Sequence, residues 1–397
     1  MSDYETYRKA FEGRPAPFAY VDLDRLDANA AAMVRSAGGK RIRIASKSIR
    51  SPAIMRRILA SDPAYQGIMC FTAAEAAFLA EQGFDDLLLG YPQTDERPIR
   101  ELLGWIAAGR SIVFMADDEE HLRLLERLAR ELGLERPVPV CLDLDLSVSY
   151  PGLHFGVKRS PLRGWRDVRP LAERILGSPA LELAGLMGYE AQVAGVGDDV
   201  PGQPLQNALI RLLQKRSIAE AARRRAEAVA GLRSLGAPPR LVNAGGTGSL
   251  STSSREADVT ELTAGSGFYS PALFDRYRRF RLEPAAGFAV PVARLPERAV
   301  ATCLGGGYVG SGAAGKDRLP VPYLPPGLRL LPLEGAGEVQ TPLRLPPGTE
   351  LAIGDPVFFR HAKAGELCER FDRLLAVSGG RVVDEYPTYR GMGACFL

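Results

Sequence analysis

The chain has 397 residues, of which 46% are hydrophobic and 24% charged, so it can hold two or three soluble folding units with a sizeable core. No window approaches the 18 or so uncharged apolar residues of a membrane span, and the polar stretch 1–15 lacks the pattern of an export signal. The 50 Lys and Arg residues and the 47 Asp and Glu residues give a net charge of +3, and the positive residues are scattered along the chain. These features argue against membrane and nucleic-acid-binding proteins, and we expect a cytoplasmic location.

Between residues 40 and 265, short apolar runs alternate with longer amphipathic ones, which is typical of βα units around a parallel sheet. The clearest helix is expected from Thr72 to Gln82, where Thr72 and Glu75 have capping-box spacing and Gly83 follows as a stop. The expected strands are Ile42–Ser46, Ile68–Phe71, Leu87–Gly90, Ile112–Met115, Val138–Asp143, Leu183–Gly188, Leu241–Ala244 and Glu261–Ala264. Eight strands with helical segments between them predict a (β/α)8 TIM-type barrel.

The last third of the chain has a different pattern. After Tyr277 the helical period disappears, and 13 of the 30 prolines lie there between short β-like runs. This pattern predicts a second, mostly β C-terminal domain. We assign 16–275 to the barrel and 276–397 to the β domain, with the segment 1–15 packing on the β domain. The apolar run Phe18–Asp22 precedes the barrel and could join the sheet of the second domain.

Two glycine-rich runs in the second domain resemble nucleotide-binding loops only superficially. Residues 305–310 fit G-x-G-x-x-G, and residues 310–317 fit G-x-x-x-x-G-K with Asp317 in place of the magnesium-binding Ser or Thr. Neither run is followed by the helix that such loops require. We expect both to be turns near the mouth of an active site.

Chemically capable residues follow several of the expected strands. Because the reactive groups of a barrel stand at the carboxyl ends of its strands, these residues are expected to share one rim. They are Lys47, His154, Tyr189, Gln192 and the turn Gly245-Gly246-Thr247-Gly248-Ser249. A lysine there can act as a Schiff-base nucleophile, and a glycine turn at a helix start can hold a phosphate. Together they predict an aldehyde cofactor with a phosphate, which is pyridoxal 5'-phosphate (PLP). Asp143 and Asp145 are interpreted as strand-end carboxylates outside the site.

Five sequence segments resemble one enzyme family. The segments are YVDLDRLDANAAAM, RIRIASKSIRS, MGYEAQVAG, VNAGGTGS and ELTAGSGFY, and the resemblance extends from about Pro17 to the last residues. The chain resembles the alanine-racemase-type (fold type III) PLP enzymes, and within them the branch of the D-threonine aldolases and D-serine dehydratases. This resemblance implies a PLP enzyme, and homodimers are expected for enzymes of this kind.

The resemblance also implies roles for individual residues. Lys47 would form the Schiff base with the cofactor, and His154 would face its pyridine ring. Tyr189 and Gln192 would line its rim. The phosphate would be held by Gly245, Gly246, Thr247 and Gly248, with Gly265 and Tyr269 completing that site.

The segment around His361 bears on the choice of reaction. In the D-threonine aldolase branch a His and, two residues later, a Cys or Asp bind a divalent metal, whereas this chain has His361 followed by Lys363. A protonated lysine repels a dication, so the resemblance implies a metal that this chain is poorly equipped to bind. His361 and Cys368 are its expected ligands if a metal is present. Otherwise His361 is expected to act as general acid or base, with Lys363 supplying the positive charge. On a strand, positions i and i+2 share one face.

Three reactions on an amino acid substrate remain open. We favour retro-aldol cleavage of a D-configured β-hydroxy amino acid to glycine and an aldehyde, with Lys47, His361 and Lys363 as catalytic residues. A D-serine-type dehydratase or deaminase, which gives a 2-oxo acid and ammonia, is the second candidate, and an amino-acid racemase using Tyr308 or Tyr323 is the third. A PLP-binding carrier without catalysis is disfavoured by the large second domain.

Overall fold

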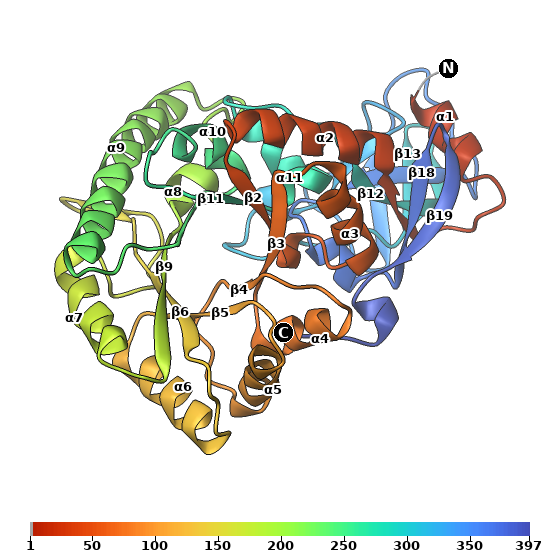
Figure 1. The fold of residues 1–397 in the computed structure, drawn as a ribbon. Coiled ribbons are helices and arrows are strands. Elements are labelled where there is room, and N and C mark those ends of the chain that lie inside the picture. The colour runs from red at the N-terminus through yellow and green to blue at the C-terminus, as the bar shows by residue number, and fades with distance from the viewer. Residues whose placement is uncertain (1–2) are drawn as a thin grey trace.

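Eight parallel strands form a closed barrel in residues 3–397, the part of the chain that the computed structural model describes. In closed order they are β2 (Arg41–Ala45), β3 (Tyr65–Cys70), β4 (Leu87–Leu89), β5 (Ile112–Ala116), β6 (Val138–Asp143), β9 (Leu181–Gly188), β10 (Leu241–Ala244) and β11 (Glu261–Ala264). Figure 1 shows the barrel surrounded by helices on the left and the second domain on the right. Every expected strand lies within three residues of an observed one, and the predicted (β/α)8 barrel is confirmed.

The barrel interior contains a buried ion pair below the mouth. Arg43 on β2 is 3% exposed, and its Nε lies 2.6 Å from Oε1 of Glu261 on β11. Asn243 on β10 donates hydrogen bonds to Glu261 at 2.7 Å and to the Thr263 hydroxyl at 2.9 Å. Charges inside a barrel are tolerated only when they are paired and hydrogen-bonded. These polar contacts therefore hold the side chains below the mouth of the barrel in fixed positions.

Helices connect the barrel strands. They are α2 (Leu23–Ser36), α3 (Pro52–Ser61), α4 (Ala73–Glu81), α5 (Glu96–Ala107), α6 (Glu119–Glu131), α7 (Trp165–Leu176), α8 (Ala191–Ala194), α9 (Pro204–Ser234), α10 (Leu250–Ser253) and α11 (Ser266–Tyr269). Side chains of Asp22, Thr72, Asp95 and Asp118 accept hydrogen bonds from first-turn N–H groups of α2, α4, α5 and α6 and so begin these helices. Within residues 3–397, no helix has both the length and the apolar character needed to cross a membrane.

The second domain is built on a nine-stranded sheet. Its strands are β1 (Phe18–Asp22), β12 (Ala286–Glu297), β13 (Val300–Leu304), β14 (Val321–Leu324), β15 (Arg329–Leu330), β16 (Gln340–Arg344), β17 (Pro356–Arg360), β18 (Arg373–Ser378) and β19 (Arg381–Pro387). Strand β1 pairs antiparallel with β12 and parallel with β18. The range 16–275 assigned to the barrel therefore includes one strand whose hydrogen bonds lie in the other sheet.

The N-terminal helix α1 (Asp3–Ala10) packs on this sheet through aromatic rings. The rings of Tyr4, Tyr7 and Phe11 lie 5.6–6.2 Å from that of Phe358 on β17. The Tyr4 hydroxyl donates a hydrogen bond of 3.2 Å to the Pro356 carbonyl. Burial of large aromatic side chains is a major source of packing energy, and it attaches this helix to the β domain.

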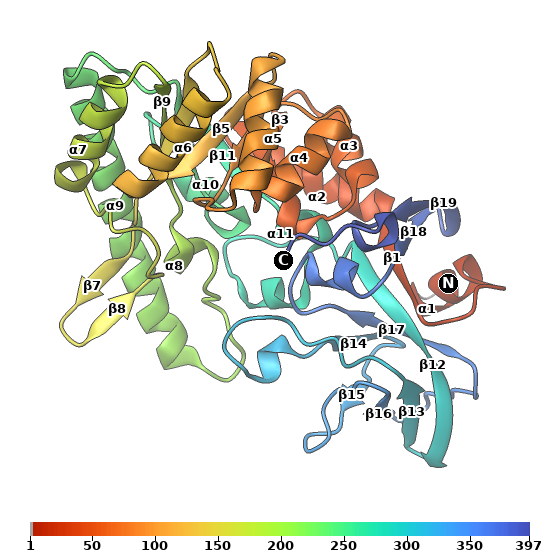
Figure 2. The same ribbon diagram turned by 90° about the horizontal axis from the view of Figure 1, so that it is seen from below.

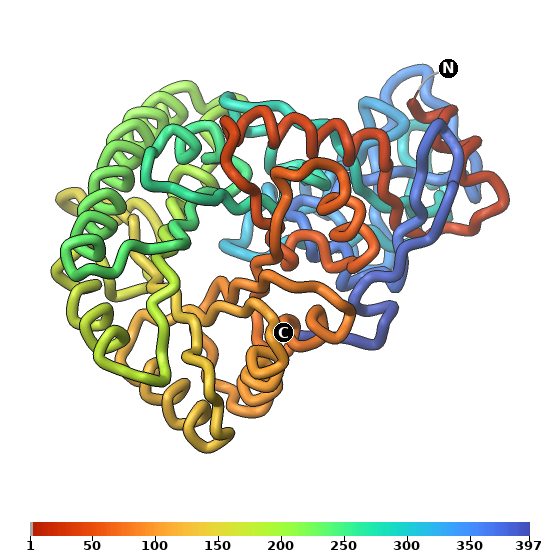
Figure 3. Tube along the Cα trace, in the orientation of Figure 1, coloured from red at the N-terminus to blue at the C-terminus, as the bar shows by residue number. Residues whose placement is uncertain are grey.

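The chain returns to the barrel after β19, and Figures 1 and 3 show its end beside the orange segment that contains α4. There the Phe396 ring packs against Phe78 at 5.3 Å, and the Tyr389 hydroxyl donates to Glu75 at 2.8 Å. The Glu75 carboxylate also accepts a hydrogen bond from the Phe71 N–H at 2.8 Å. In a full capping box it would accept from the Thr72 N–H instead. Glu75 is fully buried, and burial raises its pKa to about 7 although these hydrogen bonds oppose the shift.

The raised pKa of Glu75 predicts a pH-dependent stability. Because the folded state holds this proton up to about pH 7 and the unfolded state loses it near the ordinary value of 4.5, the free energy of unfolding falls as pH rises between these values. The loss from this group is about 3 kcal/mol. Urea unfolding of the wild type and the Glu75→Gln variant from about pH 5 to about pH 8 should show a steeper decline in the wild type, because other buried carboxyl groups such as Asp143 contribute equally to both proteins. Parallel stability curves for the two proteins would contradict the assignment.

Candidate active site

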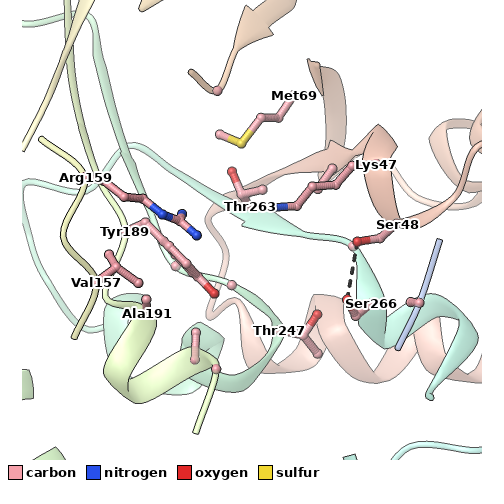
Figure 4. Close-up of a pocket in the computed structure, with 18 of the residues that line it drawn as sticks. Lys47, Ser48, Met69, Val157, Arg159, Tyr189, Ala191, Thr247, Thr263 and Ser266 are labelled. Carbon is pink, nitrogen blue, oxygen red and sulfur yellow. Dashed lines mark hydrogen bonds between the residues drawn. The ribbon is translucent and has the colours of Figure 1, made fainter. Parts of the chain in front are cut away.

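A cavity of about 740 Å³ opens at the carboxyl ends of the barrel strands, a size common for small-molecule sites. Figure 4 shows side chains from several strand ends directed into it. Of the residues predicted from the sequence, its lining includes Lys47, His154, Tyr189, Gln192, Gly245, Gly246, Thr247, Gly265 and Lys363. Four others, Gly248, Tyr269, His361 and Cys368, lie outside that lining.

Lys47 lies in a short 3-10 turn, Ser46–Ser48, directly after β2. Its Nζ donates a hydrogen bond of 2.6 Å to the Tyr91 hydroxyl, which also lines the cavity. The turn itself is fixed, since the Ser46 hydroxyl donates to the Met69 carbonyl at 2.9 Å and Arg50 Nε donates to the Lys47 carbonyl at 2.9 Å. The lysine amine is therefore presented to the cavity from a rigid base.

Tyr91 is a site residue that the sequence analysis missed. Burial alone would raise the pKa of its phenol, but the charges of Lys47 and Arg159 and the hydrogen bond from Lys47 outweigh burial and lower it. Tyr91 follows β4 by two residues. The rule that reactive groups follow barrel strands would have found it.

The glycine turn after β10 meets the turn after β11. Gly267 N–H donates to the Thr247 hydroxyl at 3.0 Å, and the Ser48 and Ser266 hydroxyls lie 3.3 Å apart, as the dashed line in Figure 4 shows. A Cβ atom at Gly265 would lie 2.8 Å from the Ser48 hydroxyl oxygen. Only glycine allows this approach, and backbone N–H groups at such turns form a favourable environment for an anion.

A buried charged network supports the glycine turn from behind. Glu190 is 2% exposed, and its carboxylate accepts from the Gly245 N–H at 3.4 Å and from the Ser253 hydroxyl. Arg225 on α9 is 1% exposed and donates to Glu190 at 3.2 Å and to Glu256. Arg225 Nε has no hydrogen-bond partner within residues 3–397, but the other contacts pair these charged groups, and buried networks of paired groups restrain a structure. The network thus joins helix α9 to the turn that faces the cavity.

Tyr189 and Gln192 follow β9 and line the cavity, and Figure 4 shows Tyr189 on the side opposite Lys47. Gln192 Nε2 donates to the Leu146 carbonyl at 2.7 Å. Its Oε1 is buried and has no hydrogen-bond partner within residues 3–397. A buried acceptor without a partner is costly, so this atom is ready to accept a hydrogen bond from a ligand.

Arg159 and His154 both line the cavity, and the Arg159 side chain points into it in Figure 4. His154 belongs to the hairpin β7 (Val148–Tyr150) and β8 (Leu153–Phe155), which projects from the barrel in Figure 2. Its ring nitrogens face the Ser149 hydroxyl at 3.3 Å and the Val157 carbonyl at 3.1 Å. The Arg159 guanidinium lies beside Tyr189 in Figure 4 and 5.9 Å from the Tyr91 ring. Arg159 lies in a loop after the hairpin, and no pattern in the sequence marked it as a site residue.

Asp143, at the end of β6, also lines the cavity, although the sequence analysis excluded it from the site. Burial and the charge of Asp117 raise its pKa to about 7, and Arg159 opposes the shift. A carboxyl group that titrates near neutrality inside a cavity is typical of functional sites.

Tyr269 is separated from the cavity by the turn that carries Lys47. It is fully buried, and its hydroxyl donates a hydrogen bond of 2.9 Å to the Ile49 carbonyl. Helix α11 turns this side chain away, so only Gly265 of the predicted G-x-x-x-Y pair faces the cavity. In this position Tyr269 supports the Lys47 turn from beneath.

We expected His361 and Lys363 to share one face of a strand. In the structure β17 ends at Arg360, so both residues lie beyond the strand. Lys363 Nζ donates to the Ser311 hydroxyl at 2.8 Å, and burial together with the charge of Lys47 lowers its pKa although Glu366 opposes the shift. His361 is 3% exposed, and burial and the charge of Arg360 lower its pKa to about 3, which keeps the imidazole neutral. It lines a second cavity that adjoins the first.

These residues do not fit a divalent metal. Lys363 brings a cation to the second ligand position, and burial raises the pKa of Cys368 to about 12, whereas a metal needs the thiolate. The Cys368 thiol donates to the Ile49 carbonyl. No group of three or more His, Cys, Asp or Glu within residues 3–397 is arranged to hold a metal ion.

The same cavity does fit PLP. It offers an amine at Lys47, backbone N–H groups at the turns of Gly246 and Gly265 for a phosphate, and the free acceptor Oε1 of Gln192. These features come from four different barrel strand ends. The fit is therefore a property of the assembled barrel.

Comparisons with known proteins agree with this geometry. The family model described as alanine racemase, N-terminal domain, matches residues 21–272. A curated 3-hydroxy-D-aspartate aldolase of Paracoccus denitrificans is 24% identical over 262 residues, which are 66% of this chain and 62% of that relative. The chain thus matches less than two thirds of the relative's length.

Two solved structures show the same fold over 95% of this chain. One is a D-threonine aldolase from Filomicrobium marinum, with 22% identity, 95% of its own chain covered and a TM-score of 0.79. The other is a D-threo-3-hydroxyaspartate dehydratase from a Delftia species, with 20% identity, 98% of its chain covered and a TM-score of 0.75. With its barrel, its strand-end lysine and this family match over residues 21–272, the chain belongs to the alanine-racemase-type family of PLP-dependent enzymes.

Proposed function

We propose that the chain is a PLP-dependent lyase that cleaves D-configured β-hydroxy amino acids to glycine and an aldehyde. The observation that carries the proposal is the position of Lys363, a cation from the second domain that lines the same cavity as Lys47. PLP, when bound, supplies an aldehyde for an amino group and draws electrons from the bonds at Cα. The 3-hydroxy-D-aspartate aldolase and the D-threonine aldolase among the similar proteins support this reaction class.

In this proposal the barrel residues hold the cofactor. Lys47 holds the aldehyde end, and the turns of Gly246, Thr247 and Gly265 bind the phosphate through their N–H groups. Tyr91 hydrogen-bonds the Lys47 amine at 2.6 Å and keeps it oriented. Gln192 and Arg159 bound the other side of the cavity. These groups are common to every reaction considered, so they do not select among them.

In this proposal the second domain supplies the group that acts on the β-oxygen of the substrate. Breaking the Cα–Cβ bond requires that a proton leave the β-oxygen of the substrate. Lys363 Nζ lines the cavity, and burial with the charge of Lys47 lowers its pKa, which favours release of its proton. In this proposal the Lys363 amine accepts the proton of the β-oxygen and becomes an ammonium group beside the carbonyl oxygen of the aldehyde product. His361, which burial and the charge of Arg360 keep neutral, lies in the adjoining cavity.

Dehydration to a 2-oxo acid and ammonia is the second candidate. It needs the opposite proton transfer, because a proton must be given to the leaving β-hydroxide. The ammonium form of Lys363 could give that proton, and the Delftia dehydratase shares the fold. The racemase alternative has less support, since Tyr308 packs against Phe288 and Phe371 and Tyr323 is hydrogen-bonded to Arg25, so neither lines the main cavity.

Product analysis tests the proposed reaction. Purified protein with PLP is offered D-threonine, D-phenylserine and D-serine, with and without EDTA. We expect glycine and the matching aldehyde, at rates that EDTA leaves unchanged because the residues do not fit a metal. The Lys47→Ala variant is the control and should be inactive. An oxo acid with ammonia would replace the aldolase by the dehydratase, and loss of activity in EDTA would contradict the metal argument.

Substitution of Lys363 tests its catalytic role. The Lys363→Met variant keeps the length of the side chain without its charge, and we expect turnover of D-threonine to fall between about 10-fold and 1000-fold. Lys316→Met is a matched control, because Lys316 is exposed in the neighbouring loop and lines neither cavity. Steady-state kinetics distinguish the two variants. Undiminished turnover in Lys363→Met would remove this residue from the mechanism.

A further inference from the structure

The glycine-rich loop 305–320 joins β13 to β14 and reaches the main cavity. It contains the run 310–317, whose resemblance to a nucleotide-binding loop is only superficial. Two residues of the loop, Ser311 and Arg318, line the cavity together with Lys47. The function proposed above leaves Arg318 without a role, although its side chain belongs to the same cavity as the reactive lysine.

This loop is held beside Lys363. The Gly310 N–H donates to the Arg318 carbonyl at 2.8 Å and closes the loop on itself. The Ser311 N–H donates to the Glu366 carboxylate at 2.8 Å, and the Ser311 hydroxyl accepts from Lys363 Nζ at 2.8 Å. A Cβ atom at Gly310 would lie 3.3 Å from that of Lys363, so the two segments are in close contact. The position of Arg318 is therefore fixed relative to the lysine that acts on the β-oxygen.

The Arg318 guanidinium has hydrogen-bonding capacity that the chain does not use. It packs against the backbone at Gly312, where a Cβ atom would come within 3.3 Å of it. Its Nε lies 3.6 Å from the Asp317 carboxylate, which is also 3.8 Å from Arg276. No nitrogen of the guanidinium donates a hydrogen bond within residues 3–397, and no other carboxylate there, the terminal one included, lies within 4.0 Å of it. A guanidinium with free N–H groups in a cavity is suited to bind a carboxylate through two parallel hydrogen bonds.

Under the proposed function two anions occupy the main cavity, the cofactor phosphate and the α-carboxylate of the amino acid. The phosphate has backbone N–H groups at the turns of Gly246 and Gly265, which both belong to the barrel. Arg318 comes instead from the second domain. Burial and the charges of Lys47 and Arg318 lower the pKa of Lys363 against the effect of Glu366, so the Arg318 charge is within electrostatic range of Lys363. This location favours the substrate over the phosphate as the ligand of Arg318.

We propose that Arg318 binds the α-carboxylate of the amino acid substrate. The inference rests on the proposed function and restricts the substrates to free α-amino acids, because an amide, an ester or a simple amine offers the guanidinium no charge. The second domain then holds the substrate at two points, with Arg318 on the α-carboxylate and Lys363 on the β-oxygen. Arg318 is a binding residue and transfers no proton, since a guanidinium stays protonated.

Binding of unreactive ligands tests the inference without turnover. D-alanine and D-alaninamide have the same shape, differ in the charge of the group on Cα and lack the β-hydroxyl that cleavage needs. The PLP-loaded protein is titrated with each ligand and followed by the change in cofactor absorbance. We expect the wild type to bind D-alanine about tenfold or more tightly than D-alaninamide, because only the acid forms a charge-assisted pair with Arg318.

Substitution of Arg318 assigns this preference to the loop. Arg318→Met should weaken D-alanine binding about tenfold or more and leave D-alaninamide within about twofold of the wild type. Arg318→Lys keeps the charge without the paired N–H groups and should retain part of the preference. Arg329→Met is the matched control, because Arg329 on β15 is exposed and lines neither cavity. It should behave as the wild type.

Titration of the cofactor-free protein with PLP separates the two anions. If Arg318 binds the substrate, the affinity of Arg318→Met for PLP stays within about twofold of the wild type. Weaker PLP binding with unchanged D-alanine binding would assign Arg318 to the phosphate and overturn the inference. Equal binding of acid and amide by the wild type would overturn it as well, and so would an equal effect of Arg318→Met on both ligands. If Arg318→Met does not fold, an unchanged preference in Arg318→Lys would overturn it.

The outcomes also separate this inference from the proposed function. Cleavage of D-threonine by the wild type would leave the proposed function intact even if the acid and the amide bind equally. If neither ligand changes the cofactor spectrum and no substrate is cleaved, the proposed function itself fails, and the role of Arg318 fails with it.

Discussion

The backbone of the second domain lies directly against the turn that carries Lys47. A Cβ atom at Gly365 would come within 2.0 Å of the Lys47 carbonyl oxygen, and Gly365 has a φ of 89°. Only glycine satisfies both conditions without displacement of the backbone. Arg50, three residues after Lys47, also has a positive φ of 52° and is held there by its bonds to the Lys47 carbonyl and to Glu369. The two domains therefore meet at the reactive lysine.

This contact explains how both domains contribute residues to one site. The barrel supplies a pre-formed place for the cofactor, because the Lys47 turn, the glycine turn and the Glu190–Arg225 network are all fixed by buried hydrogen bonds. The β domain brings Lys363 and the second cavity to the same lysine through the segment around Gly365. The first part suits any reaction of a PLP enzyme, and in the function proposed above the second part acts on the β-oxygen of the substrate.

Local patterns predicted the barrel and nine of the residues that line the cavity. Apolar runs of strand length, each followed by a helical period, locate the eight barrel strands because these strands are largely buried. Lys47, Tyr189 and Gly246 were found because each follows such a strand. Tyr91 could have been found by the same rule.

The remaining features depend on contacts between distant segments. Arg159 is aimed into the cavity by a loop after a hairpin, and Tyr269 is turned away by a short helix whose direction no local pattern gives. The second cavity joins residues near 310 to residues near 365, which a linear pattern cannot bring together. The positions of His361 and Lys363 beyond the end of β17 likewise follow from where that strand stops pairing.

Chemical trapping of the cofactor tests the central claim that the whole cavity is organised around Lys47. Borohydride reduction of the PLP-loaded protein fixes the cofactor to the lysine that holds it, and peptide mass spectrometry then identifies that lysine. The account predicts the label on Lys47, in the peptide that follows β2. A label on Lys363 or on another lysine, or no label on a protein that binds PLP, would contradict it.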